Sequence, residues 1–370
     1  MRIAFVANTA WYIFNFRLNL ILFLKTKGYE IIVIAPFDRY TKFLEKKGIK
    51  VHNIKLDQSG INPYNEIKSI YQINLILKKE KINLLISFTP KGNIYSAIAC
   101  IINKIKFIPG VSGLGRTFIH KSILTIIVFY LYKITFRRAY KVFFENKDDE
   151  KMFIDNGLCT KVQAQYVPGA GLDLNKFKPS NNIVIKNNNK LTFILISRML
   201  WDKGIGEFVE AARIIKKLSK FTEFKLLGVI DEKNASGISE KQILKWVEEG
   251  VVEYLGETDD VRSYIESSDC VVLPSYREGL PRILLEASAM GCPIITTNVP
   301  GCRETLINYK TGFICQAKSV NDLSLMLLNF INLTTLERVN MGNSGRNYVS
   351  KKFDENIVFN HYLDSIILSL

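Results

Sequence analysis

The fold of this chain is decided by residues 271–291, which read VVLPSYREGLPRILLEASAMG. The apolar run from Cys270 to Leu273 predicts a buried parallel strand. Pro281, followed by good helix formers up to Gly291, predicts a helix that begins just after a loop. A strand, a loop and a helix in this order form the repeating unit of open parallel α/β sheets, which bind ligands at the carboxyl ends of their strands.

Two carboxylates border the crevice that this unit would form. Glu278 lies in the loop and Glu286 lies inside the helix, among apolar residues where a bare carboxylate is costly to bury without hydrogen-bond donors. A ribose diol could supply those donors. The backbone at Gly279 and Leu280 opens the helix, whose free N–H groups and dipole suit a phosphate. These features favour a nucleotide sugar, and the alternative is that each Glu simply pairs with a Lys or Arg.

A wider set of motifs carries a family resemblance. Glu278-x7-Glu286, the run Ser197-Arg198-x4-Lys203-Gly204 before it and the run Pro300-Gly301-Cys302-Arg303-Glu304 after it resemble the retaining GT-B glycosyltransferases of family 4. More narrowly, the chain is similar over nearly its whole length to bacterial transferases that extend undecaprenyl-pyrophosphate-linked oligosaccharides, including N-acetylgalactosaminyltransferases. The resemblance implies an α/β fold of the GT-B type, with two Rossmann-like domains facing a central cleft and a C-terminal helix that crosses back to the first domain.

The resemblance also implies roles for residues of this chain in moving a hexose or N-acetylhexosamine, with N-acetylgalactosamine as the best guess, from a UDP-sugar. Arg198 and Lys203 would neutralise charge on the leaving UDP, and Glu278 would contact the donor sugar, as a nucleophile or as a bystander. The expected donor-binding residues are Glu286 at the ribose, Gly279, Leu280, Pro281 and Leu255, although Leu255 could equally be a core residue before a turn. A nucleotide-sugar epimerase and a lipid-binding scaffold without catalysis remain the alternatives.

No metal or cofactor is expected, because the sequence contains no Asp-x-Asp and its six cysteines include no CxxC pair. The chain starts directly with an apolar strand, without the charged lead and cleavage site of a secretory signal. We therefore expect the protein to stay in the cytoplasm, and the resemblance implies a peripheral location at the cytoplasmic face of the bacterial inner membrane.

The positive charge is divided unevenly along the chain. Residues 1–180 hold 28 Lys and Arg against 12 Asp and Glu, whereas residues 181–370 hold 22 against 23. Such an excess predicts attraction of the first half to an anionic membrane surface. A nucleic acid is not expected as a partner, because no recognised binding motif accompanies the charge. A compositional bias toward lysine would explain the lysine count without explaining its uneven division.

Length and periodicity predict two domains. A chain of 370 residues with 48% hydrophobic content exceeds what one core usually supports. Strands are expected at 3–6, 31–35, 51–54, 84–88 and 142–144 in the first half, and at 191–196, 225–229, 252–255, 270–273, 294–297 and 313–315 in the second. Polar, turn-rich residues near 180–190 indicate the hinge. The expected division is an acceptor-binding domain at 1–180, a UDP-sugar domain at 190–350 and a crossover helix at 351–370.

The first domain lacks a Gly-rich phosphate turn, which favours the acceptor as its ligand. A helix is expected at 14–27, and the residues proposed to contact a polyprenyl-pyrophosphate-linked acceptor are Asn15, Arg17, Lys91 and His120. Arg17 could equally be a surface charge on its helix, and His120 a histidine at a helix entry. The apolar stretch at 123–136 is too short to span a bilayer, which needs about 20 residues. It predicts a core helix or, given its basic flanks, a helix that lies in the membrane interface.

Overall fold

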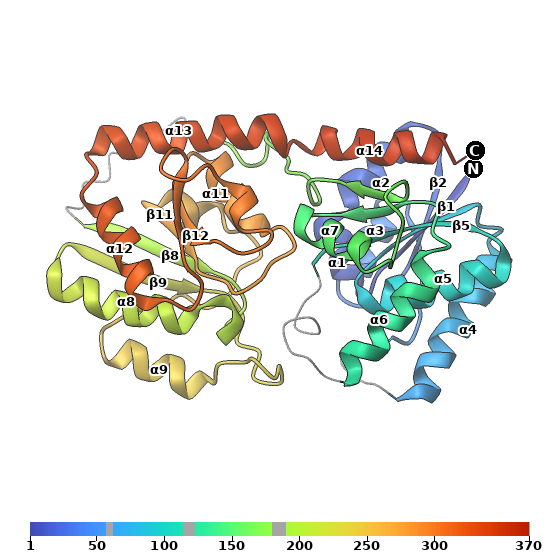
Figure 1. The fold of residues 1–370 in the computed structure, drawn as a ribbon, viewed down its shortest axis with the longest axis horizontal. Coiled ribbons are helices and arrows are strands. Elements are labelled where there is room, and N and C mark those ends of the chain that lie inside the picture. The colour runs from blue at the N-terminus through green and yellow to red at the C-terminus, as the bar shows by residue number, and fades with distance from the viewer. Residues whose placement is uncertain (57–61, 114–122, 180–189, 370) are drawn as a thin grey trace. The chain divides into compact units, whose positions relative to one another are not determined.

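Two parallel sheets, each covered by helices, form the molecule (Figure 1). The computed structural model describes residues 1–56, 62–113, 123–179 and 190–369. The first unit comprises Met1–Gly171 together with Glu355–Leu370, and the second unit comprises Leu172–Asp354. The expected α/β class with two Rossmann-like domains is confirmed.

The first unit contains a seven-stranded sheet in the order β3-β2-β1-β4-β5-β6-β7, in which all pairs are parallel. Its strands are β1 (Arg2–Val6), β2 (Glu30–Ile34), β3 (Lys50–His52), β4 (Leu84–Phe88), β5 (Lys106–Val111), β6 (Val142–Phe144) and β7 (Ala164–Tyr166). The sequence did not predict β5 or β7. Pro109 and Gly110 lie inside β5, and both residue types argue against a strand when read locally. Strand β7 has only three residues, all partly buried.

Eight helices cover the described part of the first sheet. They are α1 (Ala10–Phe16), α2 (Leu18–Thr26), α3 (Thr41–Lys46), α4 (Pro63–Lys79), α5 (Pro90–Asn103), α6 (Ile123–Phe136), α7 (Lys147–Asp155) and α14 (Glu355–Ile367). The single helix expected at 14–27 is wrong. The Thr9 side chain caps a helix that already begins at Ala10, and the backbone leaves helical geometry at Arg17 before α2 starts.

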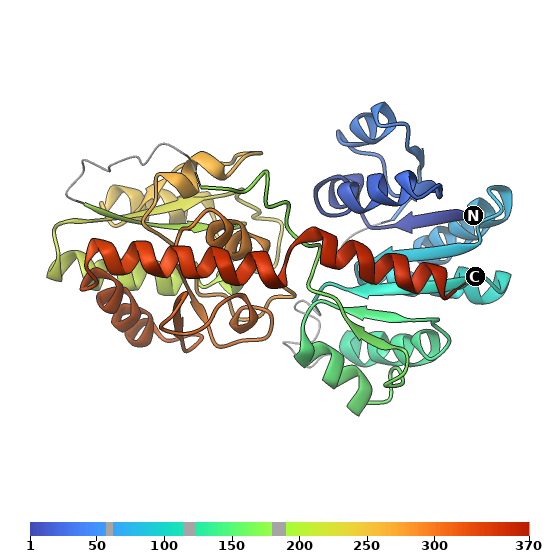
Figure 2. The same ribbon diagram turned by 90° about the horizontal axis from the view of Figure 1, so that it is seen from above.

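The last helix begins at Glu355, and the chain from Glu355 to Leu370 belongs to the first unit, whereas residues 351–354 of the expected crossover segment belong to the second. In Figure 2, α14 is the right-hand of the two red helices and lies over the strands of this unit. Phe359 stacks on Phe23 of α2 with ring centroids 5.1 Å apart, and Tyr362 meets Phe143 of β6 edge-on at 4.7 Å. These contacts make α14 part of the core of the first unit.

The boundary between the units also differs from the expected one. It falls at Gly171, and residues 172–179 pack on the second unit instead of ending the first domain. Leu172 and Phe177 are buried there with Leu285, and Arg346 donates a hydrogen bond to the Phe177 carbonyl at 3.2 Å. Polar composition suggested a hinge at 180–190, but burial of these two apolar side chains fixes the division earlier. Residues 180–189 lie outside the described part of the chain.

The second unit contains a six-stranded parallel sheet in the order β10-β9-β8-β11-β12-β13. Its strands are β8 (Leu191–Ile196), β9 (Thr222–Leu227), β10 (Glu253–Tyr254), β11 (Cys270–Leu273), β12 (Ile294–Thr297) and β13 (Gly312–Cys315). Its α-helices are α8 (Ile205–Leu218), α9 (Glu240–Glu248), α10 (Arg262–Glu266), α11 (Arg282–Ala289), α12 (Val320–Ile331) and α13 (Thr335–Lys352), with short 3-10 helices η2 (Trp201–Lys203) and η3 (Arg303–Thr305). All six expected strands are present, with ends shifted by up to three residues.

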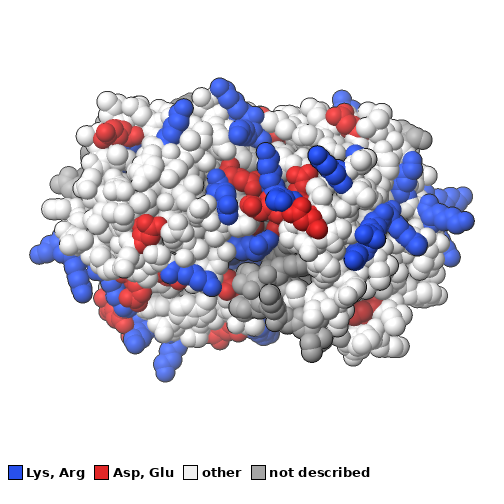
Figure 3. Space-filling model, viewed as in Figure 1, with Lys and Arg blue, Asp and Glu red and all other residues white. Residues whose placement is uncertain are grey.

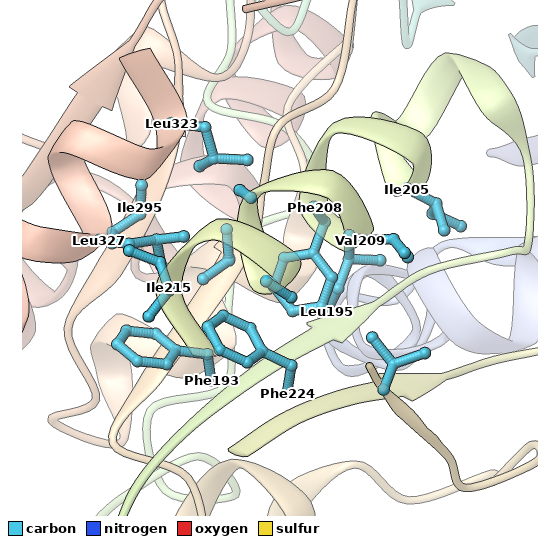
Figure 4. Close-up of a cluster of buried hydrophobic side chains, with 14 of the residues drawn as sticks. Phe193, Leu195, Ile205, Phe208, Val209, Ile215, Phe224, Ile295, Leu323 and Leu327 are labelled. Atoms are coloured by element: carbon cyan, nitrogen blue, oxygen red, sulfur yellow. The ribbon is translucent and has the colours of Figure 1, made fainter. Parts of the chain in front are cut away.

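One apolar cluster holds α8 against this sheet (Figure 4). Phe193 of β8 and Phe224 of β9 stack with ring centroids 5.2 Å apart, and Phe208 of α8 meets Phe224 edge-on at 5.6 Å. Leu323 and Leu327 of α12 belong to the same cluster. Because both ends of the β8–α8 unit are anchored in this core, the loop that connects them has little freedom to move away from the sheet edge.

Candidate active site

Three loops meet at one edge of the second sheet. They follow β8, β11 and β12, which are neighbours in the sheet, and they contain the motif residues 197–204, 274–281 and 300–304. Because the strands are parallel, their carboxyl ends lie at the same edge. The sheet order therefore brings together motifs that are up to about a hundred residues apart in sequence.

Glycines allow these loops to pack backbone against backbone. A Cβ atom at Gly204 would lie 2.1 Å from the Pro274 carbonyl oxygen, and one at Gly301 would lie 2.2 Å from the Gly279 carbonyl oxygen. Both glycines also have positive φ angles, 74° and 78°. The Tyr276 N–H donates to the Asp202 carbonyl at 2.9 Å and closes the first contact. The loops thus form one rigid wall instead of three separate turns.

Lys203 and Glu278 form an ion pair on this wall. Lys203 Nζ lies 2.5 Å from Glu278 Oε1, and the two side chains are 21% and 13% exposed. The Glu278 N–H donates to the Pro300 carbonyl at 3.3 Å, which ties the pair to the third loop. Two of the three residues expected to be catalytic are therefore in direct contact.

The Arg198 side chain has a different partner from that of Lys203. Its guanidinium is mostly exposed, and Nη1 lies 3.8 Å from Asp231 Oδ2. The preceding residue, Ser197, is held against Gly228, where a Cβ atom would lie 1.8 Å from the Ser197 carbonyl oxygen. The backbone of Arg198 is thus fixed, whereas its side chain extends along the rim toward Asp231.

Two helices begin at this edge without a side-chain cap. Helix α8 follows Gly204 and helix α11 follows Pro281, and neither of these residues offers a side-chain acceptor to the first N–H groups. The first N–H groups of a helix need partners, and the helix dipole favours an anion there. The start of each helix can therefore receive phosphate oxygens. Leu280, just before α11, packs on the apolar cluster around Leu285.

Glu286 is buried in α11 and has a basic partner one turn earlier. Arg282 Nε donates to Glu286 Oε1 at 2.8 Å. Burial raises the pKa of the Glu286 carboxyl, while Arg282 and Lys176 act in the opposite direction. Pairing of Glu286 with an Arg, which the sequence left open as the alternative, is thus present, and the role of Glu286 at a ribose stays a prediction.

A cavity of about 730 Å³ in the second unit is lined by Lys176, Asp260 and Met290 among others, but Glu286 itself does not line it. Two of its lining residues, Lys176 and Asp260, are close enough to influence the pKa of the Glu286 carboxyl. The size falls within the ~300–1,000 Å³ that small-molecule sites usually have.

Sequence reasoning missed several residues of the wall. The Tyr276 hydroxyl donates to Glu207 Oε1 at 2.6 Å, and Lys318 Nζ lies 4.9 Å from the centre of the Tyr276 ring. Cys302 is fully buried behind the ion pair, and burial together with Glu278 raises the pKa of its thiol to about 12. Cys302 lies in the motif at 300–304, which the sequence marked without assigning roles, whereas no local signal marked Tyr276.

Leu255 is partly buried at the end of β10, a position that fits either of its two expected roles. It directly follows β10, its N–H donates to the Leu226 carbonyl at 2.9 Å, and its side chain packs with the apolar cluster around Leu227. The following Gly256 has a φ of 76° and turns the chain. The Leu255 side chain thus packs against the apolar cluster of its own unit.

The acceptor-binding candidates lie in the first unit, where the structure gives three of them protein partners. Asn15 Nδ2 donates to the Trp11 carbonyl at 3.0 Å, one turn earlier in α1. Lys91 Nζ lies 2.6 Å from Glu66 Oε1 and links the first turns of α5 and α4. His120 lies outside the described residues.

Arg17 is the centre of a buried polar network, so its interpretation as a surface charge is wrong. The residue is 2% exposed. Its Nη2 donates to Glu145 Oε1 at 2.8 Å and to the Tyr12 hydroxyl at 3.1 Å, and the guanidinium lies 4.1 Å from the centre of the Phe88 ring. Burial raises the pKa of the Glu145 carboxyl, against the opposing effect of Arg17. The network holds α1 and α2 against the ends of β4 and β6.

Two family models match the chain. The model described as glycosyl transferases group 1 matches residues 177–348, and the model described as glycosyl transferase 4-like matches residues 2–146.

Curated relatives match over most of the length. The N,N'-diacetylbacillosaminyl-diphospho-undecaprenol alpha-1,3-N-acetylgalactosaminyltransferase of Campylobacter jejuni is 30% identical over an alignment of 377 positions. The alignment covers 98% of this chain and 97% of the relative. The UDP-Gal:alpha-D-GlcNAc-diphosphoundecaprenol alpha-1,3-galactosyltransferase of Escherichia coli is 22% identical over 304 residues, which cover 80% and 78%.

Solved structures share the fold. HepE of Anabaena, crystallised with UDP and glucose, has a TM-score of 0.80 at 18% identity over 100% of both chains. WaaG, a glycosyltransferase involved in lipopolysaccharide biosynthesis, has a TM-score of 0.75 at 16% identity over 98% of both chains. At these identities the likeness concerns the fold alone, which is the expected GT-B fold. The two family models and the relative that is 30% identical over nearly the whole length show that this chain belongs to the group 1 glycosyltransferases, the family 4 enzymes that its motifs resemble.

Proposed function

We propose that this protein transfers an N-acetylhexosamine or hexose, with N-acetylgalactosamine as the best candidate, from a UDP-sugar to an undecaprenyl-diphosphate-linked saccharide with retention of the anomeric configuration. The observation that carries the proposal is the Lys203–Glu278 ion pair at the edge where α8 and α11 begin without side-chain caps. The names of the Campylobacter jejuni and Escherichia coli relatives, which specify diphospho-undecaprenol acceptors, support the acceptor class.

The donor diphosphate would bind between the two helix starts and Lys203. The backbone N–H groups and the positive end of a helix start suit its oxygens, and the Lys203 ammonium would neutralise the charge that develops when the bond to UDP breaks. The diphosphate would compete with Glu278 for this ammonium. Release of Glu278 from Lys203 would leave the carboxylate free to contact the donor sugar, so that donor binding itself would prepare the site.

The nucleoside would be held by Glu286. A carboxylate can accept at both oxygens, so that Arg282 and a ribose hydroxyl could donate to it together. Arg282 would then orient the carboxylate before the ligand arrives, and the cavity in the second unit would give the nucleoside room. Arg198, at the rim, would leave Asp231 to reach a phosphate oxygen.

The acceptor would bind in the first unit, and catalysis would require no metal, because the cations and helix starts meet the charge of the leaving group. Asn15, Lys91 and His120 are the proposed contacts, whereas Arg17 would position α1 through its network instead of touching the acceptor. We propose that the enzyme works peripherally at the cytoplasmic face of the bacterial inner membrane.

A transfer assay tests the proposal directly. The purified protein is incubated with a panel of UDP-sugars and undecaprenyl-diphosphate-linked mono- and oligosaccharides, with and without chelator, and the products are analysed by mass and by the NMR coupling of the new anomeric proton. We expect one N-acetylhexosamine or hexose to be added in the α configuration from an α-linked donor. Conversion of a UDP-sugar into its epimer without any acceptor would identify an epimerase instead, and binding of the lipid without turnover of any donor would identify a scaffold.

A further inference from the structure

Two neighbouring helices of the first unit expose apolar stripes to solvent. On α4, the stripe contains Tyr64, Ile67, Tyr71 and Leu75, which are 73%, 67%, 59% and 47% exposed. Their spacing of three or four residues places them on one helical face. On α6, the stripe contains Ile126, Ile127, Tyr130 and Ile134, which are 58%, 51%, 59% and 64% exposed. Single exposed apolar residues are ordinary, but two such stripes on one unit indicate a surface that something covers.

Both stripes belong to the outer surface of the same helical layer. Helices α4 and α6 pack on α5, with Ile73 and Leu77 of α4 and Tyr132 and Phe136 of α6 buried in one cluster. These buried residues lie on the faces opposite the stripes. The inner faces therefore account for the stability of the layer, and its fold gives no reason for the apolar outer faces.

Basic residues accompany the stripes. Lys68 and Lys78 continue the exposed face of α4, while Arg137 and Arg138 directly follow α6. Helix α6 contains no Asp or Glu, and the only acid in α4, Glu66, is paired with Lys91.

Positive charge also prevails over the first unit as a whole. It holds 26 Lys and Arg against 13 Asp and Glu, whereas the second unit holds 24 against 22. In Figure 3, Lys and Arg side chains appear on both sides of the view, and those on the right-hand part belong to the first unit.

We propose that the outer faces of α4 and α6, here called the α4–α6 face, lie on an anionic lipid bilayer, with the apolar stripes in the interface and the basic residues among the head groups. Tyrosines and aliphatic side chains suit this depth, and long basic side chains can keep their charges in the head-group layer. In the described part of the chain, no helix is long and apolar enough to cross a membrane. The charge distinguishes lipid from a second copy of this chain, because two such basic faces would repel each other.

Vesicle sedimentation with the full-length protein, without any substrate, tests this surface. Vesicles of phosphatidylcholine alone are compared with vesicles that also contain phosphatidylglycerol, at 0.05 M and 1 M salt. We expect preferential binding to the anionic vesicles. Each basic residue near an acidic surface contributes about a fivefold factor in partitioning, so the double variant Lys78→Glu/Arg138→Glu should bind at least tenfold more weakly at low salt. The binding that remains at 1 M salt should be lost in Ile127→Ser/Ile134→Ser, because screening removes only the electrostatic part.

The matched control is Leu336→Ser/Val339→Ser on α13, which changes two apolar residues that are 69% and 52% exposed in the second unit. It should bind as the parent does. Equal binding to both kinds of vesicle, or loss of binding in the control alone, would overturn the proposal. A parent dimer that becomes a monomer in Ile127→Ser/Ile134→Ser would show that the face covers a second copy. None of these outcomes bears on the proposed sugar transfer, because no donor or acceptor is present.

Discussion

Lys203 Nζ lies 2.5 Å from Glu278 Oε1, although the two residues are 75 positions apart in the sequence. The pair joins the loop after β8 to the loop after β11. A ligand that binds either residue must therefore change the environment of both.

Replacing Lys203 tests the role of its charge at the leaving group. We expect Lys203→Ala to lower turnover about 100-fold or more, because a positioned cation at the developing charge is typically worth about 3 kcal/mol. Steady-state transfer kinetics measure the effect. The matched control is Lys225→Ala, which removes a lysine of similar exposure, 26%, from its ion pair with Glu253 on β9 and β10. Turnover within a few-fold of the parent in Lys203→Ala would rule out the proposed role.

Calorimetry with UDP tests whether Glu278 and Glu286 have different roles. We expect Glu286→Ala to weaken UDP binding, whereas Glu278→Ala should abolish transfer without weakening UDP binding, because the diphosphate then no longer competes with this carboxylate for Lys203. Because Arg282 donates to Glu286 at 2.8 Å, Arg282→Ala shows whether the ribose depends on the carboxylate itself or on its orientation. A smaller loss of affinity in Arg282→Ala than in Glu286→Ala supports direct contact. Equal loss of UDP affinity in Glu278→Ala and Glu286→Ala would contradict this division of roles.

Gly204 should tolerate no side chain. Its φ is 74°, and a Cβ atom would lie 2.1 Å from the Pro274 carbonyl oxygen, so that Gly204→Ala must push the loops apart. We expect it to lower the free energy of unfolding by about 3 kcal/mol or more. Gly250→Ala is the control, because Gly250 has a similar φ of 68° with nothing within 4 Å of a Cβ atom. It should cost about 1 kcal/mol. Denaturant unfolding distinguishes them, and equal losses would mean that the close approach to Pro274 is unimportant.

The Arg17–Glu145 pair should govern the stability of the first unit. Arg17→Ala leaves a buried carboxylate without its cation, which typically costs about 3–5 kcal/mol. Replacing both partners, as in Arg17→Met/Glu145→Leu, should recover much of this loss. Denaturant unfolding measures both free energies, and a double variant no more stable than Arg17→Ala would argue against an electrostatic origin.

The same pair gives a pH dependence with a defined sign. Burial raises the pKa of Glu145 in the folded state. A raised carboxyl pKa contributes stability below the ordinary value of about 4.3 and loses it as pH rises through the folded-state pKa. Arg17 opposes that rise, so its removal raises the folded pKa further. The difference in unfolding free energy between the parent and Arg17→Ala should therefore widen as pH increases from about 5 to 8, and a difference that stays constant would contradict the coupling.

Much of the fold was predictable because its signals are local. The apolar run at β11, the loop with Glu278 and the helix with Glu286 appear in the structure as the sequence predicts, because periodicity and helix-start residues act over a few positions. The strands β5 and β7 were not predictable in the same way. Pro109 and Gly110 disfavour a strand locally, and only pairing with β4 and β6 makes residues 106–111 one.

The sequence by itself determined which residue types follow the strands of the second unit, and hence the family. It also determined the uneven division of charge. Only the tertiary structure decided the partners of charged side chains that are far apart in the sequence. Glu278 meets Lys203, which is 75 positions away, and Arg17 is buried against Glu145, which is 128 positions away. Local pattern fixes which residues can form a helix or a strand, whereas burial and ion pairing depend on the order of strands in the sheet, which brings distant loops to the same edge.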